Sequence, residues 1–283
     1  TTNIETLQYV VTDGSTFTDL QTRDTTYTVE ALDDSGMSCR VTSTAKNGKY
    51  TLVTDYLTDT RRNSVAMQAT LEPARGVKNL SVYVRMDATV NGNGGGGDPT
   101  TQNAGADDAV IDTSTGSQVP VSIDTQTATI AANRDYATPV YVALRADRRF
   151  RAASSGYVDT ASDGLAQLDA DRMLAATYTT ATSGNVVQIA QVDARPNRPF
   201  TLALGFGTDQ ATAVREAGRT ARTDFDDLSD RYEEGWDDYL DSLQRPGNPP
   251  GLSRRERAEV RHTYRTSAAV LKASEDKTFP GAI

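Results

Sequence analysis

Four polar side chains in residues 152–169 are the groups best suited to binding chemistry. Tyr157, Asp163, Gln167 and Asp169 lie in a polar stretch rich in turn residues, which predicts a long loop between strands. Hydroxyl, carboxylate and amide groups on a loop of a rigid scaffold can hydrogen-bond a sugar. The alternative is an ordered connection that packs through its two leucines, so these four residues are candidate substrate contacts.

A second group of polar residues has the chemistry of a calcium site. Asp98, Asn103, Asp107 and Asp108 lie close together in the sequence, and Ca²⁺ takes clustered carboxylate and carbonyl oxygens. Their spacing is not that of the EF-hand loop, which favours a solvated acidic loop. We expect no resident cofactor and no metal site, with Ca²⁺ as the one cation that these residues would suit.

The other titratable residues give no catalytic pattern. Glu233 and Glu234 are adjacent, and on a helix they point about 100° apart, so they cannot flank one scissile bond. His262 is the only histidine and Cys39 the only cysteine. A zinc site and a Cys–His nucleophile pair are therefore unsupported, and we assign no catalytic residue.

Alternating apolar residues predict strands over most of the first two hundred residues. Leu80, Val82, Val84 and Met86, for example, fall on one face of a strand, and a period of two indicates a half-buried antiparallel strand. The candidate strands are 7–11, 26–32, 39–45, 50–57, 65–71, 80–86, 139–146, 173–180, 185–193 and 202–206. So many strands without intervening helices predict two stacked sheets, a large antiparallel sandwich.

Glycines occur in two kinds of connection between these strands, a tight turn and a long loop. Asn47-Gly48 joins two strand candidates and is typical of a tight hairpin. Residues 91–118 instead contain a run of consecutive glycines followed by acidic residues, which is too flexible to hold a strand. We expect that segment to be a long surface loop.

One apolar stripe runs through the region after the strands. Its members step by three or four residues, as on one face of a helix. They are Val214, Ala217, Ala221, Phe225, Leu228, Tyr232, Trp236, Tyr239 and Leu243. We expect a single helix about 45 Å long, whose stripe forms a domain interface and connects the sandwich to something else.

A proline- and glycine-rich break at 244–251 ends this helix, because proline cannot continue the hydrogen-bond ladder. Ser253 and Glu256 then form a capping-box pattern that predicts the start of a second helix. Its expected buried face consists of Val260, Tyr264, Ala268 and Leu271. The chain ends within a short apolar run, which leads us to expect a module from a longer polypeptide.

Composition narrows the possible partners. The net charge is −9 and the sequence pI is near 4.7, which argues against nucleic acid or an anionic membrane, since both attract basic proteins. No apolar run is long enough to span a membrane. Many Thr residues and only 7% aromatic residues fit a secreted β-protein, so we expect an extracellular location, with any signal peptide outside these residues.

Nine stretches together resemble the N-terminal domain of bacterial glycoside hydrolase family 15, the glucoamylase and glucodextranase group. They cover nearly the whole chain. These stretches are 8–17 (QYVVTDGSTF), 51–59 (TLVTDYLTD), 131–136 (AANRDY), 143–147 (ALRAD), 153–157 (ASSGY), 161–169 (ASDGLAQLD), 184–187 (GNVV), 204–207 (LGFG) and 270–283 (VLKASEDKTFPGAI).

The resemblance implies a β-supersandwich, a linker helix and then an (α/α)6 barrel that lies outside this chain. It implies exo-hydrolysis of α-glucosidic bonds with inversion, performed by two glutamates of the barrel. Inversion requires a general acid and a general base far enough apart to admit water. Neither matching motif is present here, so no catalytic residue is carried over. The resemblance also implies that the chain begins inside the family's domain.

We therefore expect three segments: a supersandwich at 1–207, a linker helix with its break at 208–251, and the start of a helical catalytic domain at 252–283. The first hypothesis is an accessory, structural domain whose partner is that catalytic domain and which meets α-glucan or isomalto-type oligosaccharide through the parent enzyme. The second is an autonomous carbohydrate-binding module. A trehalose-cleaving or other glycosidase parent remains open, as do the linkage preference and the oligomeric state.

Overall fold

The structure, a computed structural model, describes residues 4–33, 35–90, 107–125, 139–244, 246–247, 250–275 and 281. Asp98, Asn103, residues 131–136 and the last two residues of the chain lie outside this set. None of the helices in the described part of the chain combines the length and apolar character needed to cross a membrane.

Strands are the main regular elements in the described chain before residue 208. Their bounds are β1 Thr6–Thr12, β2 Thr18–Leu20, β3 Thr25–Ala31, β4 Cys39–Ala45, β5 Tyr50–Thr58, β6 Ser64–Pro73, β7 Ser81–Asp87, β8 Asp108–Asp112, β9 Val119–Asp124, β10 Val140–Ala146, β11 Ala152–Tyr157, β12 Thr180–Ala181, β13 Val186–Val192 and β14 Phe200–Gly207. The helices are α1 Gln21–Asp24, α2 Gly164–Asp171, α3 Gln210–Ala221, α4 Phe225–Ser242 and α5 Arg254–Ala273.

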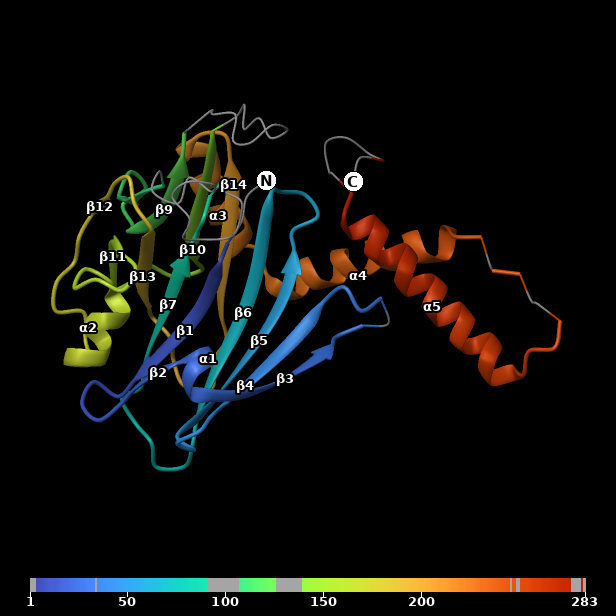
Figure 1. The fold of residues 1–283 in the computed structure, drawn as a ribbon, viewed down its shortest axis with the longest axis horizontal. Coiled ribbons are helices and arrows are strands. Elements are labelled where there is room, and N and C mark those ends of the chain that lie inside the picture. Colours follow the sequence, from blue (N-terminus) through green and yellow to red (C-terminus); the bar gives the residue numbers. More distant parts are fainter. Residues whose placement is uncertain are drawn as a thin grey trace.

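Within the described residues the strands form two antiparallel sheets (Figure 1). The smaller has five strands in the order β11-β13-β7-β1-β2, and the larger has nine in the order β12-β8-β9-β10-β14-β6-β5-β4-β3. The predicted mainly β, two-sheet sandwich is confirmed, because alternating residues of both sheets share one core. That core includes Leu52, Met67, Val84, Met86, Leu144, Phe200 and Leu202.

The glycine turn between β4 and β5 fixes the register of these two strands, at the Asn47-Gly48 pair that the sequence analysis singled out. Gly48 adopts a φ of 71° in the β4–β5 connection, a conformation that costs glycine little and other residues more. Its amide donates to the carbonyl of Ala45 at 2.9 Å. Thr44 then pairs with Thr51 and Leu52 with Ser43, so the two strands present their apolar sides to the same core.

Three expectations about the strand region are wrong, at least in part. Of the loop expected at 91–118, residues 91–106 lie outside the described set, but residues 108–112 form β8. The loop expected at 152–169 contains β11 and most of α2. The strand expected at 173–180 is absent apart from Thr180, the first residue of β12. Strand formation depended on partners rather than on local pattern: β8 and β11 each find a neighbouring strand, whereas residues 175–179 are exposed.

The apolar stripe forms two helices rather than the single helix expected. α3 ends at Ala221, and α4 begins at Phe225 with Asp224 as its N-cap. The Asp224 carboxylate accepts from the amide of Asp226 at 3.0 Å, and the Thr223 hydroxyl donates to the carbonyl of Arg219 at 2.9 Å. These local bonds compete with the hydrogen bonds of a continuous helix, so the helix is interrupted here. The apolar residues nevertheless recur at the same three- and four-residue spacing across the break.

The last helix begins as the sequence predicted. The Ser253 hydroxyl accepts from the amide of Glu256, and the Glu256 carboxylate accepts from the amide of Ser253, which completes a capping box. α5 packs beside α4 and extends away from both sheets (Figure 1). We call α4 and α5 together the helical arm.

Candidate functional site

Asp163, the most buried of the candidate sugar contacts, has a structural role. Its side chain is 2% exposed and caps α2 by accepting from the amide of Leu165 at 2.9 Å. Its second carboxylate oxygen lies 2.9 Å from a guanidinium nitrogen of Arg85, which also contacts Asp87 at 3.3 Å. A carboxylate so enclosed is not available to a sugar at the surface.

The other three candidates are also engaged within the chain. Tyr157 donates its hydroxyl to the carbonyl of Thr182 at 3.0 Å. Gln167 is buried and accepts from the amide of Ala176 at 2.8 Å. Asp169 forms a two-point ion pair with Arg23, at 2.8 and 2.9 Å. Tyr157 ends β11, whereas the other three residues cap α2 or lie on it. The structure gives each of the four a partner within the chain, and their role in sugar binding stays a prediction.

The acidic residues considered for calcium lie in different surroundings. Asp107 is 6% exposed, and burial, followed by the nearby carboxyl of Asp124, raises its pKa to about 8. Asp108 accepts from the amide of Ser183 at 2.9 Å. Among the described residues, no group of three or more His, Cys, Asp or Glu side chains is arranged to hold a metal ion.

The first part of the stripe covers the outer face of the nine-stranded sheet. Val214 and Ala217 of α3 are buried against Val121 and Ala143, and Ala221 at the end of α3 is also buried. Small residues allow this close approach. A Cβ placed on Gly205 of β14 would lie 2.2 Å from the backbone nitrogen of Ala217, so only glycine fits there.

The next part of the stripe anchors the helical arm to the sandwich. Phe225, Leu228 and Tyr232 of α4 are buried with Leu57 and Ala66 from β5 and β6. The Tyr232 hydroxyl also donates to the carbonyl of Met37 at 3.1 Å. Six of the nine residues predicted for a domain interface are thus buried against the sandwich of this chain.

Of the remaining stripe residues, Trp236 packs against the cluster of Phe225, Leu228 and Tyr232, and Tyr239 contacts α5. Trp236, Tyr239 and Leu243 are half-buried, and Trp236 packs edge-on against the rings of Tyr232 and Tyr239 at centroid distances of 6.1 and 6.0 Å. The Tyr239 hydroxyl donates to the carbonyl of Ala268 at 3.2 Å. For these three residues, an interface with another domain stays a prediction.

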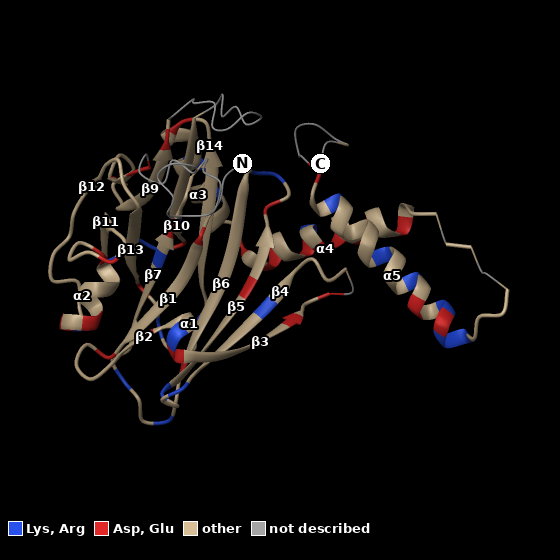
Figure 2. Ribbon diagram, in the orientation of Figure 1, with Lys and Arg blue, Asp and Glu red and all other residues tan. Residues whose placement is uncertain are grey.

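Charge supports the pairing of the two arm helices. Figure 2 shows mostly acidic residues along α4 and several basic residues along α5. Arg265 of α5 lies 3.3 Å from the carboxylate of Asp241 on α4. Both side chains are exposed, so the ion pair adds little stability, but the opposite charges favour this arrangement of the helices.

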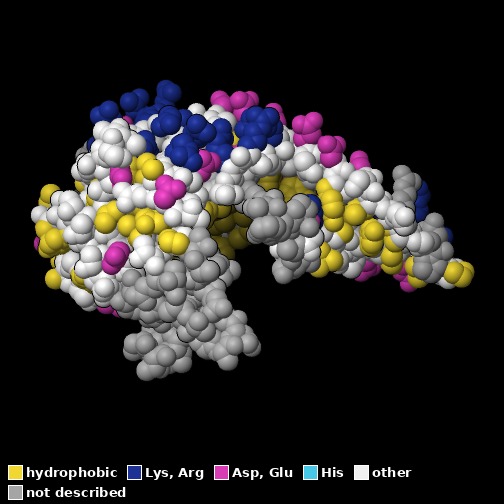
Figure 3. Space-filling view, turned by 90° about the horizontal axis from the view of Figure 1, so that it is seen from above, with side chains coloured by type: hydrophobic (Ala, Val, Ile, Leu, Met, Phe, Trp, Pro, Cys, Tyr) yellow, Lys and Arg dark blue, Asp and Glu magenta, His cyan; other side chains and the backbone are white. Residues whose placement is uncertain are grey.

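Three large apolar residues of α5 are exposed in the part of the chain that the structure describes. Val260 is 39% exposed, Val270 is 53% exposed and Leu271 is 60% exposed, whereas Ala269 is fully buried. The expectation that Val260 and Leu271 would be buried is therefore not met here. Figure 3 shows hydrophobic side chains gathered along the arm, on the side that borders the hollow between the arm and the sandwich.

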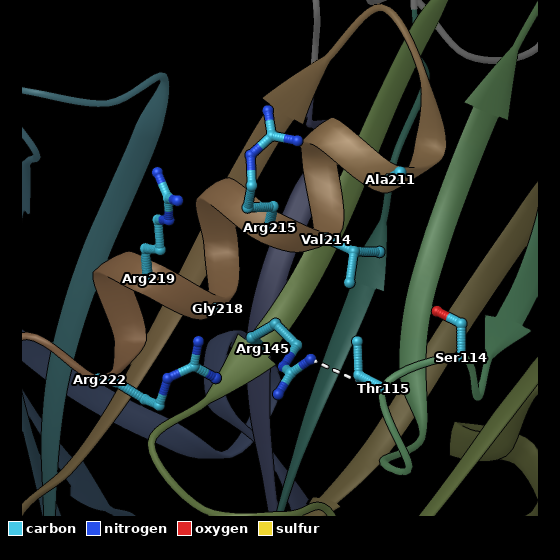
Figure 4. Close-up of a pocket in the computed structure, with 9 residues that line it drawn as sticks. All are labelled: Ser114, Thr115, Arg145, Ala211, Val214, Arg215, Gly218, Arg219 and Arg222. Carbon is cyan, nitrogen blue, oxygen red and sulfur yellow. Dashed lines mark hydrogen bonds between the residues drawn. The ribbon is translucent and has the colours of Figure 1, made fainter.

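A basic pocket was missed by the sequence analysis. A cavity of about 390 Å³ on the outer face of the nine-stranded sheet is lined by four arginines, Arg145 from β10 and Arg215, Arg219 and Arg222 from α3 and its C-cap (Figure 4). The signal was present: three of these arginines recur at four- and three-residue spacing, which places them on one helix face. Only the fold brings Arg145 to them.

Comparison with known proteins agrees with this architecture. Residues 1–241 match the family described as glucodextranase, domain N. The chain belongs to this family. The resemblance drawn from the nine sequence stretches is thereby confirmed, and the two-sheet sandwich is the fold expected of it.

Individual relatives extend the family match over the whole chain. A glucoamylase of Clostridium sp. (strain G0005) is 27% identical over all 283 residues. A bacterial glucoamylase crystallised with acarbose matches 96% of the chain at 25% identity with a TM-score of 0.76. A glycosyl hydrolase of family GH92, ccman5, shares the fold over 87% of the chain at 12% identity with a TM-score of 0.51, and 31% of it is covered.

The chain spans only part of these relatives. It covers 35% of the length of the Clostridium glucoamylase and 35% of the crystallised glucoamylase. The family match ends at residue 241, near the end of α4, while both glucoamylase alignments extend to or near the end of α5.

Proposed function

We propose that this domain is the N-terminal accessory domain of a secreted α-glucan hydrolase of the glucoamylase or glucodextranase kind. Its role is to support and position a catalytic (α/α)6 domain of the same polypeptide. The family match and the glucoamylase relatives support this proposal. The parent enzyme would act on α-glucan or isomalto-type oligosaccharide, by inversion.

The exposed apolar face of α5 is the observation that carries the proposal. Burial of leucine and valine side chains contributes roughly 25 cal/mol for each Å² of apolar surface removed from water. An exposed row of such side chains therefore favours binding of another surface over it. Val270 and Leu271 are more than half exposed among the described residues. The occupant we assign is the catalytic domain, because about two thirds of each glucoamylase relative lies outside the match to this chain.

The carboxylates of this domain support a structural rather than a catalytic role. An inverting hydrolase needs one carboxylic acid and one carboxylate facing each other across a water-accessible gap. Asp163 is enclosed by Arg85 and α2, and Asp169 is paired with Arg23. The acid and base are therefore assigned to the catalytic domain.

The aromatic residues do not favour an autonomous carbohydrate-binding module. Such a module stacks sugar rings on neighbouring exposed aromatics. Tyr27 and Tyr178 are the exposed tyrosines in the described part of the chain. Tyr27 lies on β3, at one edge of the nine-stranded sheet, and Tyr178 lies shortly before β12, at the opposite edge, so they cannot form one platform.

Glucose release tests the proposal directly. The purified 283-residue chain is expected to release no glucose from maltooligosaccharides or dextran, whereas a polypeptide that also carries the proposed catalytic domain is expected to release it. Hydrolysis by the 283-residue chain alone would overturn the accessory role. Strong retardation of that chain in affinity gels containing starch or dextran would instead favour the carbohydrate-binding module.

A further inference from the structure

We propose that the arginine pocket binds a small molecule that carries a phosphate group. The site lies on the outer face of the nine-stranded sheet, between β10, α3 and the β8–β9 turn (Figure 4). It is separate from the arm surface assigned above to the catalytic domain. The inference therefore goes beyond the accessory role and does not depend on it.

Two guanidinium groups converge on one point of the pocket. A Cβ built on Gly218 of α3 would lie 3.4 Å from a terminal nitrogen of Arg222 and 3.7 Å from the central guanidinium carbon of Arg145. Figure 4 shows Arg222 reaching toward Arg145 beneath α3. Burial lowers the pKa of Arg145, and the positive charge of Arg222 lowers it further. Like charges held together in this way favour an anion between them.

The acidic groups near the pocket offset only part of its positive charge. Asp112 acts on Arg145 through its charge, but its oxygens accept from the amide and hydroxyl of Ser114 and from the side-chain amide of Gln210 rather than from a guanidinium group. Glu216 contacts Arg215 at 3.2 Å. Within the described residues neither Arg219 nor Arg222 forms an ion pair.

The arrangement of donors favours phosphate over a single carboxylate. Arg145 donates to the hydroxyl oxygen of Thr115 at 2.9 Å, which leaves the hydroxyl proton of Thr115 for another acceptor. Two planar guanidinium groups and one hydroxyl match an anion with three or more acceptor oxygens, whereas a carboxylate offers two. At about 390 Å³, the cavity falls within the roughly 300–1,000 Å³ typical of small-molecule sites, with room for a phosphorylated sugar.

Calorimetric titration at fixed ionic strength tests the inference. We would titrate the 283-residue chain with inorganic phosphate, a hexose 6-phosphate and the unphosphorylated hexose, which separates free from sugar-borne phosphate. Saturable binding of at least one of the two phosphates is expected.

Arg145→Gln and Arg222→Gln are each expected to weaken this binding about tenfold or more, because each removes charge-assisted hydrogen bonds. Arg75→Gln, an exposed arginine in the β6–β7 turn, is the matched control and should change affinity less than about twofold.

Thermal unfolding shows whether a variant that binds phosphate weakly is still folded. In phosphate-free buffer, Arg145→Gln and Arg222→Gln are expected to unfold at or above the wild-type temperature, because each removes one of two converging like charges. Three results would each overturn the proposal: no saturable binding of either phosphate, equal binding of the unphosphorylated hexose, or an equal loss of affinity in the Arg75→Gln control.

Discussion

Helices α3 and α5 carry apolar stripes of the same kind but lie in opposite surroundings. Ala213, Val214 and Ala217 of α3 are buried against the outer face of the nine-stranded sheet. On α5, Ala269 alone is buried among the described residues, and Leu271 is 60% exposed. Among the described residues, α3 is covered by the sandwich and the apolar face of α5 is largely exposed.

The difference shows what a hydrophobic period does and does not specify. The period indicates which face of a helix favours burial, but the cover depends on a surface of matching shape elsewhere. For α3 that surface exists, because Gly205 of β14 lets the two backbones approach closely. For α5 the most extensive contact in the described chain is with α4, and we infer that a surface of another domain covers the rest.

Gly205→Ala should have the largest effect on this contrast. The added Cβ would lie 2.2 Å from the backbone nitrogen of Ala217 and 2.5 Å from the carbonyl oxygen of Ala213, and backbone atoms cannot rotate away. We expect a loss of more than about 4 kcal/mol in the free energy of unfolding, measured in urea. Gly235→Ala in α4, where a Cβ meets nothing within 4 Å, should instead gain up to about 1 kcal/mol. Similar effects at the two sites would contradict the close packing of α3.

Leucine truncation compares the anchored and exposed ends of the arm. Leu228 of α4 is 2% exposed, and Leu271 of α5 is 60% exposed. Leu228→Ala should lower the free energy of unfolding by about 3 kcal/mol, through lost burial and the cavity left behind. Leu271→Ala should change it by less than about 0.5 kcal/mol in the 283-residue chain. A large loss from Leu271→Ala would mean that α5 is covered within this chain.

A buried hydrogen bond provides a smaller test of the α3 anchor. The Thr220 hydroxyl donates to the carboxylate of Asp59 at 2.7 Å, and both residues are fully buried. This bond helps to hold the pKa of Asp59 below its ordinary value, against the effect of burial. Thr220→Val should cost about 2 kcal/mol at pH 7, whereas Thr266→Val at an exposed position of α5 should cost less than about 0.5 kcal/mol. Equal losses would remove the distinction between the two helices.

Rising pH should weaken the sandwich through Asp107. Burial raises the pKa of this carboxyl to about 8, so the folded chain holds the proton more tightly than the unfolded chain. Its contribution to stability is fully present below the ordinary carboxyl pKa of about 4 and is lost progressively as the pH rises from there to about 8. We expect the wild-type chain to lose about 1 kcal/mol between pH 7 and pH 8 from this group, and Asp107→Asn to flatten that slope. An unchanged slope in the variant would mean that the carboxyl titrates normally.

Local sequence patterns predicted those parts of the fold that depend on neighbours along the chain. The strand expected at 39–45 coincides with β4, and the Ser253–Glu256 capping box begins α5 as expected. β8 and β11 were missed because their stability comes from strands distant in the sequence. The division of the stripe into α3 and α4 was missed because the cap at Asp224 interrupts the helix without changing the apolar spacing.

Candidate site residues were harder to interpret because their partners are remote. Asp163 is a loop carboxylate in the sequence, but its charge partner Arg85 lies 78 residues away. The basic pocket shows the same dependence. The three arginines at the end of α3 form a recognisable pattern, but only the pairing of β10 with β14 brings Arg145 beneath that helix.

Amide hydrogen exchange along α5 tests the central claim most directly. Exchange would be followed at each α5 amide in the 283-residue chain and in a polypeptide that also carries the proposed catalytic domain. If a catalytic domain covers the face bearing Val260, Val270 and Leu271, exchange at α5 will be slower in the longer polypeptide, while exchange at α3 will be the same in both. Equal exchange rates at α5 in the two proteins would contradict the account.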